Sequence, residues 1–257
     1  MIEIKSPGRI CFFGDHQDYL GLPVISGTID RYVYIKASKI ESSFFEINLL
    51  DFNESLKIEF KNDPKKIAPS DYFRAGLYVL EKNGIIPNQG YQIQINGDLP
   101  INAGLSSSSS LVVGWIKFLV KAFAVGRKID NLQIAKWAVE TEVDFFNQAG
   151  GIMDQYTISI GGLMMIDTSK KTYEKLEGSL GPLLVIDSGE SKNTQGVLSN
   201  AKVNAQEAIK HVKKSNKDFD LTKSKKSDFK KYLNEIPIKY RSYWESTILN
   251  HEITKNA

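Results

Sequence analysis

Three polar clusters in this sequence carry residue types that can do chemistry, and one of them is a run of five serines. Residues 104–110 read Gly-Leu-Ser-Ser-Ser-Ser-Ser and lead directly into an apolar stretch that reaches Val125. One serine here can serve as an ordinary helix N-cap, because its side-chain oxygen accepts a bond from an orphan backbone N–H. Several hydroxyl and backbone N–H groups at the positive end of a helix dipole can instead bind a phosphate. The chain has neither a Walker A pattern nor a GxGxxG fingerprint, so the common nucleotide-binding folds are not indicated.

The second cluster follows the segment that contains Arg9. Residues 14–19 read Gly-Asp-His-Gln-Asp-Tyr. A polar turn after a strand is ordinary, and a single histidine such as His16 is more often structural than a general base. Two carboxylates, an imidazole and a phenol on one short loop also supply many hydrogen-bond donors and acceptors. Such a loop is suited to gripping a polyhydroxylated ligand.

The third cluster centres on Asp154, within the segment Gly-Ile-Met-Asp-Gln at residues 151–155. A carboxylate near a bound phosphate can hold Mg²⁺ or accept the proton of an attacking hydroxyl. Glu142, upstream in the chain, and Asp154 could divide these two roles. We interpret Glu140 and Asp144 as solvated charges on the face of a helix.

The elements that must position these clusters mix strands and helices, which predicts an α+β fold. Apolar, β-branched segments predict strands, and helically spaced apolar residues predict helices. The predicted strands are residues 2–4 with 9–13, 32–35, 44–50, 56–60, 91–95, 162–167 and 183–187, and the predicted helices are residues 72–82, the apolar segment up to 125, 131–146, 201–214 and 243–257. We expect a loop at residues 215–227, which are rich in Lys, Ser and Asp.

The composition indicates a globular protein, because 42% of its 257 residues are apolar and 25% are charged. The net charge is only +3, and residues 202–257 hold its basic excess, with thirteen Lys and Arg against seven Asp and Glu. We therefore expect no nucleic-acid partner, and a basic interaction protein is a weaker alternative. The apolar run at residues 111–125 contains two lysines and is shorter than the ~20 residues of a membrane span. The single cysteine and an N-terminus without a basic-then-apolar leader predict a cytoplasmic protein. The oligomeric state stays open between monomer and homodimer.

The three clusters, in this order, resemble the signature segments of the GHMP kinase superfamily, which includes galactokinase, homoserine kinase, mevalonate kinase and phosphomevalonate kinase. Residues 6–19, with Ile-Asp-Arg at 29–31, resemble the sugar-contacting first motif. Residues 97–111 resemble the phosphate-binding second motif, and residues 151–156 resemble the segment of the catalytic aspartate. The resemblance covers roughly residues 1–200.

This resemblance implies the fold and the domains of the chain. It implies a ribosomal-S5-domain-2-like N-terminal domain at residues 1–165 and a truncated, ferredoxin-like C-terminal domain at residues 166–257. The superfamily's third motif, a glycine-rich loop near the C-terminus, has no counterpart in this sequence. We therefore expect an incomplete second domain.

The resemblance also implies a role for individual residues. Asp154 corresponds to the catalytic base, and Arg9 to an arginine beside the reacting phosphoryl group. Ser108 and Glu142 correspond to ligands of Mg²⁺. The implied sugar-binding residues are Asp15, His16, Asp18 and Tyr19, and the implied ATP-binding residues are Gly104, Leu105, Ser106, Ser107, Ser108 and Ser109. The implied activity is transfer of the γ-phosphoryl group of ATP to a monosaccharide hydroxyl, giving a sugar 1-phosphate.

Two features favour a galactokinase-like sugar kinase over a mevalonate-type kinase. Mevalonate kinases typically carry lysine where this chain has Arg9, and they lack the His-x-Asp-Tyr arrangement of residues 16–19. Two departures leave the sugar open: Asp15 stands where galactokinases usually have glutamate, and residues 187–194 resemble a stretch found in mevalonate-type and other branches. Because the third motif is missing, a non-catalytic homologue that binds nucleotide or sugar is a further alternative.

Overall fold

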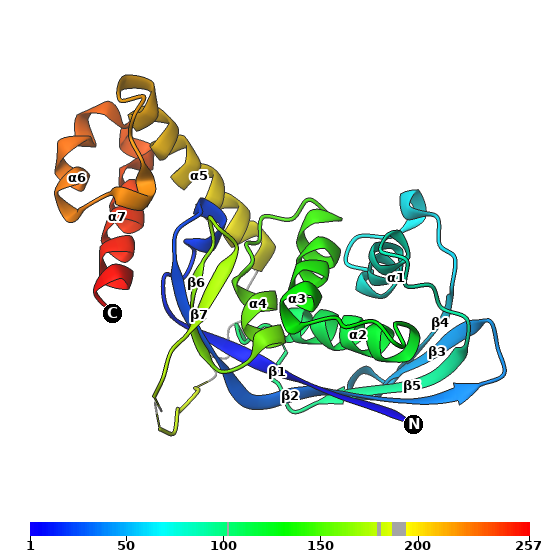
Figure 1. The fold of residues 1–257 in the computed structure, drawn as a ribbon. Coiled ribbons are helices and arrows are strands. Elements are labelled where there is room, and N and C mark those ends of the chain that lie inside the picture. Colours follow the sequence, from blue (N-terminus) through cyan, green and yellow to red (C-terminus); the bar gives the residue numbers. More distant parts are fainter. Residues whose placement is uncertain (102, 179–180, 187–193) are drawn as a thin grey trace.

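A seven-stranded sheet forms the centre of the molecule (Figure 1). The computed structural model describes residues 1–101, 103–178, 181–186 and 194–257. The strands are β1 Ile2–Phe13, β2 Val24–Ile40, β3 Phe44–Leu49, β4 Glu54–Glu59, β5 Gly90–Gly97, β6 Leu163–Asp167 and β7 Thr172–Lys175. Their order is β4-β3-β5-β2-β6-β7, and β1 pairs with the long β2. All pairings are antiparallel except β3 with β5.

Four helices lie against one face of this sheet (Figure 1). They are α1 Tyr72–Lys82, α2 Ser107–Phe123, α3 Asn131–Val139 and α4 Met153–Ile160. Alternation along β5 explains the packing, because Tyr91, Ile93 and Ile95 are buried while Gln92 and Gln94 are exposed. The buried strand residues meet the apolar α2, whose side chains are mostly buried as well.

A helical part follows the sheet and projects from one end of it (Figure 1). It consists of α5 Thr194–Ser215, α6 Lys226–Lys231 and α7 Arg241–Asn256. These helices enclose a separate apolar core around Trp244, Val212 and Ile248. Leu22, which precedes β2, is fully buried in this same core. The first polar loop of the chain is thus packed against its C-terminal helices.

The α+β class predicted from the sequence is confirmed, and two predicted elements need correction. Residues 183–186 form no strand; they are exposed, and no described strand pairs with them. Asp187 and residues 188–193, which carry most of the mevalonate-like stretch, lie outside the described residues. The loop expected at 215–227 includes a short turn of helix at residues 221–223 and the start of α6. The division at residue 165 stays a prediction, and β6 runs across it.

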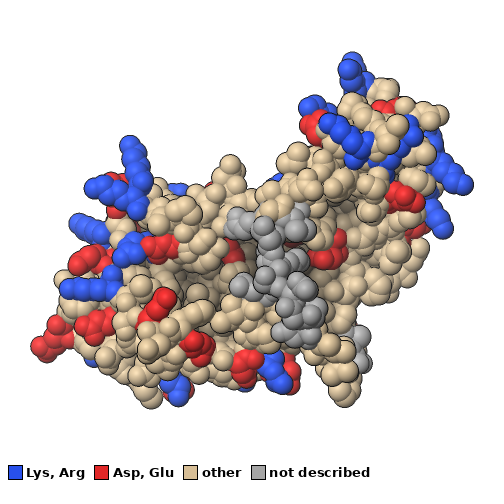
Figure 2. All heavy atoms as spheres, turned by 180° about the vertical axis from the view of Figure 1, so that it is seen from behind, with Lys and Arg blue, Asp and Glu red and all other residues tan. Residues whose placement is uncertain are grey.

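No helix in the described part of the chain is both long enough and apolar enough to cross a membrane. On the face drawn in Figure 2, Lys and Arg side chains over the C-terminal helices lie beside Asp and Glu side chains. This mixture agrees with ion pairs such as Lys210 with Glu207 at 3.1 Å. The basic excess of the C-terminal segment is therefore partly balanced where it occurs.

Candidate active site

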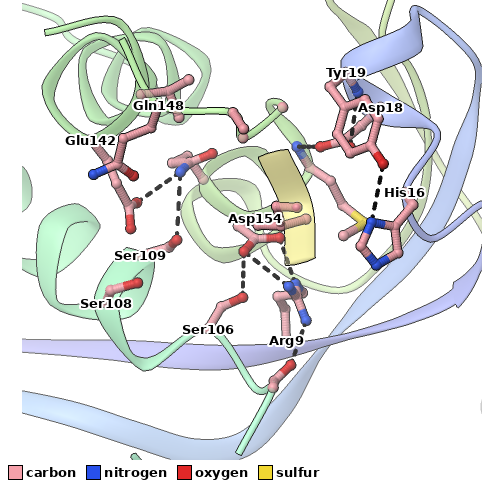
Figure 3. A pocket seen from close by; sticks show the side chains of 18 of the residues that line it. Arg9, His16, Asp18, Tyr19, Ser106, Ser108, Ser109, Glu142, Gln148 and Asp154 are labelled. Carbon is pink, nitrogen blue, oxygen red and sulfur yellow. Dashed lines mark hydrogen bonds and ion pairs between the residues drawn. The ribbon is translucent and has the colours of Figure 1, made fainter. Parts of the chain in front are cut away.

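A cavity of about 310 Å³ brings the three polar clusters together (Figure 3). It lies where the loop after β1 meets the N-terminal ends of α2 and α4. Its lining residues are Arg9, Asp15, His16, Asp18, Tyr19, Tyr72, Gly104, Ser106, Ser107, Ser108, Ser109, Glu142, Val143, Gln148, Ala149, Gly150, Gly151, Met153, Asp154, Gln155 and Leu198. The structure thus assembles one site from segments that lie up to about 190 residues apart in the sequence.

Asp154 and Arg9 form a two-point ion pair on the wall of this cavity. Arg9 Nε donates to Asp154 Oδ1 at 2.7 Å, and Arg9 Nη2 donates to Asp154 Oδ2 at 2.9 Å. The side chains are 14% and 26% exposed, so the pair faces the cavity without being fully solvated. Burial opposes the guanidinium charge, but the Asp154 carboxylate more than offsets it, and the pKa of Arg9 lies above its ordinary value. Such bidentate pairs fix a carboxylate in one orientation.

The serine run joins this pair through its first member. Ser106 precedes α2 with a left-handed backbone, φ 60° and ψ 48°, and its hydroxyl donates to Asp154 Oδ2 rather than capping the helix. Arg9 Nη1 donates to the carbonyl oxygen of Gly104 at 2.9 Å, so the same arginine also holds the loop before α2. A non-glycine residue in this conformation is uncommon, and such strain concentrates at functional sites. The first turn of α2 therefore begins beside Asp154.

A second carboxylate, Glu142, lies deeper in the same cavity. The helix that begins at Asn131 changes at Glu140 to a π-helical turn, Glu140–Asp144, and single π turns are frequent at functional sites. Gln155 Nε2 donates to Glu142 Oε2 at 2.7 Å and lies 3.5 Å from Ser109 Oγ. Burial raises the pKa of Glu142, while hydrogen bonds from Gln155, Ser109 and Ser108 act in the opposite direction.

The residues around Glu142 fit a Mg²⁺ ion. Mg²⁺ commonly takes one or two protein oxygens together with phosphate oxygens and water. Glu142 and the hydroxyl of Ser108 supply such oxygens. The buried Oε1 of Gln155 has no hydrogen-bond partner, and an acceptor of this kind fits a hydrated cation. Within the described residues, no group of three or more His, Cys, Asp or Glu side chains could hold a metal ion. A Mg²⁺ ion at Glu142 would therefore also need hydroxyl, phosphate or water oxygens.

On the other side of Asp154 lies the loop of residues 14–20 (Figure 3). Asp18 accepts bonds from the backbone N–H of Tyr19 at 2.9 Å and of Met153 at 3.3 Å. Burial, and then repulsion by the Asp154 charge, raises the pKa of Asp18 from 3.8 to about 6. His16 Nδ1 and the Tyr19 hydroxyl are 3.1 Å apart. The loop thus presents a carboxyl, an imidazole and a phenol to the cavity.

Asp18 can reach the backbone of residue 153 only because residue 151 is glycine. A Cβ atom built on Gly151 would lie 1.9 Å from Asp18 Oδ2, whereas one on Gly150 would meet its nearest neighbour, Val143 Cγ2, at 3.4 Å. The Gly151→Ala variant should therefore displace the Asp18 carboxylate and cost about 1–3 kcal/mol of stability, as overpacking does. Urea unfolding measures the stability.

The Gly150→Ala variant is the matched control, because it adds the same methyl group one residue earlier without a close contact. Its free energy of unfolding should stay within about 0.5 kcal/mol of wild type, as is usual for a change that creates no clash. Equal destabilisation of the two variants would contradict the packing argument.

Of the candidate residues named from the sequence, all but one line the cavity. The exception is Leu105, whose side chain is buried in the main core and whose carbonyl oxygen accepts from the Arg9 backbone N–H at 3.2 Å. The sequence interpretation of Asp144 as a solvated charge agrees with its exposure, and Glu140 pairs with Lys82 at 3.0 Å.

Nine lining residues were not named as candidates, among them Tyr72, Gln148, Gln155 and Leu198. Gln155 could have been suspected from its place next to Asp154. Tyr72, Gln148 and Leu198 carry no local signal, because tertiary packing alone brings them to the cavity.

Comparison with known proteins agrees with this geometry. Residues 71–162 match the family model described as GHMP kinases N terminal domain, and residues 2–39 match the galactokinase galactose-binding signature. The chain belongs to the GHMP kinases. Within that superfamily it is galactokinase-like, and the two matched regions contain the serine run, the Asp154 segment and the loop of residues 14–20.

Individual GHMP kinases show how far the likeness extends. The chain is 34% identical to a galactokinase of Pyrococcus furiosus over 176 residues, or 67% of this chain and 49% of that protein. It is 30% identical to a galactokinase of Clostridium perfringens over 244 residues, or 90% of this chain and 62% of that protein. The chain therefore spans about half to three fifths of the length of these relatives.

A solved structure extends the likeness of fold to nearly the whole chain. The galactokinase of Lactococcus lactis, complexed with galactose, matches with a TM-score of 0.83 over 99% of this chain and 68% of that one. The identity is 21%, so this match speaks for the fold. The helical C-terminal part is included in it.

Proposed function

We propose that the chain is an ATP-dependent sugar kinase that phosphorylates the anomeric hydroxyl of a monosaccharide, with galactose as the foremost candidate. The observation that carries this proposal is the position of Asp154. It is fixed by Arg9 and Ser106 in a cavity that has Ser108, Ser109 and Glu142 on one side and the loop of residues 14–20 on the other (Figure 3). A base between a phosphate-binding helix end and a polyol-binding loop is the arrangement that phosphoryl transfer to a sugar requires.

The proposed reaction needs no covalent intermediate. The sugar hydroxyl oxygen attacks the γ-phosphorus of ATP, the bond from that phosphorus to the bridging oxygen breaks, and ADP leaves. Asp154 accepts the hydroxyl proton, and its bonds from Arg9 and Ser106 hold the carboxylate in place for this role. Arg9 and the N-terminal turn of α2 stabilise the negative charge on the transferring group.

ATP is proposed to bind along residues 104–109 with its phosphates at the start of α2. Mg²⁺, when bound, neutralises charge on the phosphates, and Ser108 and Glu142 are the residues that would hold it. The sugar is proposed to bind against Asp15, His16, Asp18 and Tyr19, which offer acceptors and donors to several hydroxyl groups. We place this activity in the cytoplasm, in a monomer or homodimer.

The experiment that tests the proposal is ADP release from Mg·ATP by the 257-residue chain. Galactose, other aldoses, uronic acids, homoserine and mevalonate are offered in parallel. We expect sugar-dependent release with galactose at roughly 1–100 per second, the usual range of kinases. If mevalonate is the only acceptor that causes ADP release, the chain is a mevalonate-type kinase and not a sugar kinase. Binding of ATP without release for any acceptor would favour the non-catalytic alternative.

A further inference from the structure

The loop that carries the proposed sugar-binding residues is joined to α7 by two hydrogen bonds across almost the whole chain. Gln17 Nε2 donates to the carbonyl oxygen of Thr247 at 2.8 Å, and Gln17 is 1% exposed. Asn250 Nδ2 donates to the carbonyl oxygen of Asp15 at 2.9 Å. The two pairs are separated by 230 and 235 residues in sequence.

Apolar contacts strengthen the same junction. Leu22, directly after the loop, is fully buried among the residues of the C-terminal core, and Leu20 packs against that core. Lys202 on α5 lies with its Nζ 5.9 Å from the centre of the Tyr19 ring, and Leu198 on α5 lines the cavity. The helical part therefore supports the loop from behind.

The two hydrogen bonds flank the one residue of the loop whose backbone is strained. His16 has φ 63°, in the left-handed region that residues other than glycine rarely adopt. Asp15 before it and Gln17 after it are the residues that α7 holds. This conformation places the His16 ring 3.1 Å from the Tyr19 hydroxyl and in the cavity wall. Without the flanking contacts, the backbone of His16 would relax to a more common conformation.

We infer that α7 is a positioning element for the substrate, which acts through Asn250 and Gln17 to hold His16 in its left-handed conformation. This inference rests on the proposed function, because it assigns the loop to the sugar. It adds a role for the helical part, of whose described side chains only Leu198 lines the cavity. Asn250 and Gln17 are positioning residues, since they act through His16.

The test is the Asn250→Ala variant, because Asn250 is only partly buried and its loss should leave the fold intact. We expect KM for the sugar to rise roughly fivefold, the size of one net hydrogen bond, with kcat and KM for ATP unchanged. In a His16→Ala background the same substitution should have no further effect, because the two residues act on one conformation. Asn200→Ala is the matched control, since Asn200 donates to the Tyr243 hydroxyl at 3.3 Å within the helical part.

Hydrogen exchange provides a second measurement that needs no turnover. The backbone N–H of Gln17 donates to Gly14 O at 3.0 Å, and that of Leu20 donates to Gln17 O at 3.0 Å. These amides should exchange faster in Asn250→Ala than in wild type, while Ile47 in β3 stays unchanged.

Three results together support the inference. The Asn250→Ala substitution raises KM for the sugar selectively, it has no such effect in the His16→Ala background, and it speeds hydrogen exchange of the loop amides. An unchanged sugar KM in an active enzyme overturns it, as does a loss of kcat alone. If wild type turns over no acceptor, the proposed function fails by itself. Loop exchange then decides the coupling: unchanged exchange overturns it, and faster exchange supports it.

Discussion

The Asp154→Asn variant should lose about 10²–10⁴-fold in turnover, the usual contribution of a general base. Asparagine has nearly the same shape, so it still fills the place between Arg9 and Ser106. Its amide group cannot accept the sugar proton at neutral pH, and it leaves one Arg9 donor opposite another donor. The residues at the start of α2 that are proposed to bind phosphate are untouched, so ATP affinity should change little. Single-turnover assays and calorimetric titration with ATP measure the two quantities separately.

Asp144→Asn is the control for this experiment, because Asp144 is an exposed carboxylate in the neighbouring π-helical turn and does not line the cavity. It should keep the wild-type rate. If the Asp154→Asn enzyme also kept the full rate, Asp154 would not be the base. Positioning and charge would then be the source of catalysis.

The Asp18→Asn variant should be more stable than wild type at pH 8, and this difference should disappear as the pH falls. The folded-state pKa of Asp18 is raised from 3.8 to about 6, so folding favours the protonated form. In wild type this stabilisation is complete below the unfolded pKa, near 4, and is lost as the pH rises through 6. Asparagine mimics the protonated form at every pH.

The size of this effect follows from the shift and from the surroundings of Asp18. A pKa shift of this size corresponds to roughly 3 kcal/mol of folding free energy if solvent screens none of it. Asp18 borders an open cavity and accepts two backbone bonds, one of which asparagine would weaken, so we expect about 1–2 kcal/mol at pH 8.

Urea unfolding of both proteins at pH 4, 6 and 8 measures the difference, and sugar titration should show that the more stable variant binds its substrate less tightly. An Asp18→Asn chain no more stable than wild type at pH 8 would show that the carboxylate is not destabilised by its surroundings.

Much of the sheet and its helices could be predicted from the sequence because their signals are local. Alternation along 91–95 predicts a half-buried strand, and the structure extends it only to Gly90–Gly97. The helix predicted at 72–82 has the same bounds in the structure as α1. The apolar residues 183–186 predict a strand that the structure does not contain, because composition alone cannot say whether a partner strand exists.

The candidate site, too, could be predicted only in part. The serine run, the polar loop and Asp154 are recognisable in the sequence because each cluster is compact. The π-helical turn could not be foreseen in a segment that predicts one regular helix, although it places Glu142 inside and Asp144 outside. The contacts of Gln17 and Asn250 depend on the packing of segments more than 200 residues apart, for which a single sequence carries no signal.

That separation has a consequence for how the protein is made. Residues 14–20 are synthesised long before Asn250, which holds Asp15 and follows it 235 residues later. At about 5–20 residues per second, this interval is roughly 10–50 s. Throughout this time the nascent chain can fold its sheet, while the loop lacks the contacts that hold His16 in its left-handed conformation. The proposed competence to bind sugar should therefore arise only after α7 has been synthesised, when the sheet can already have formed.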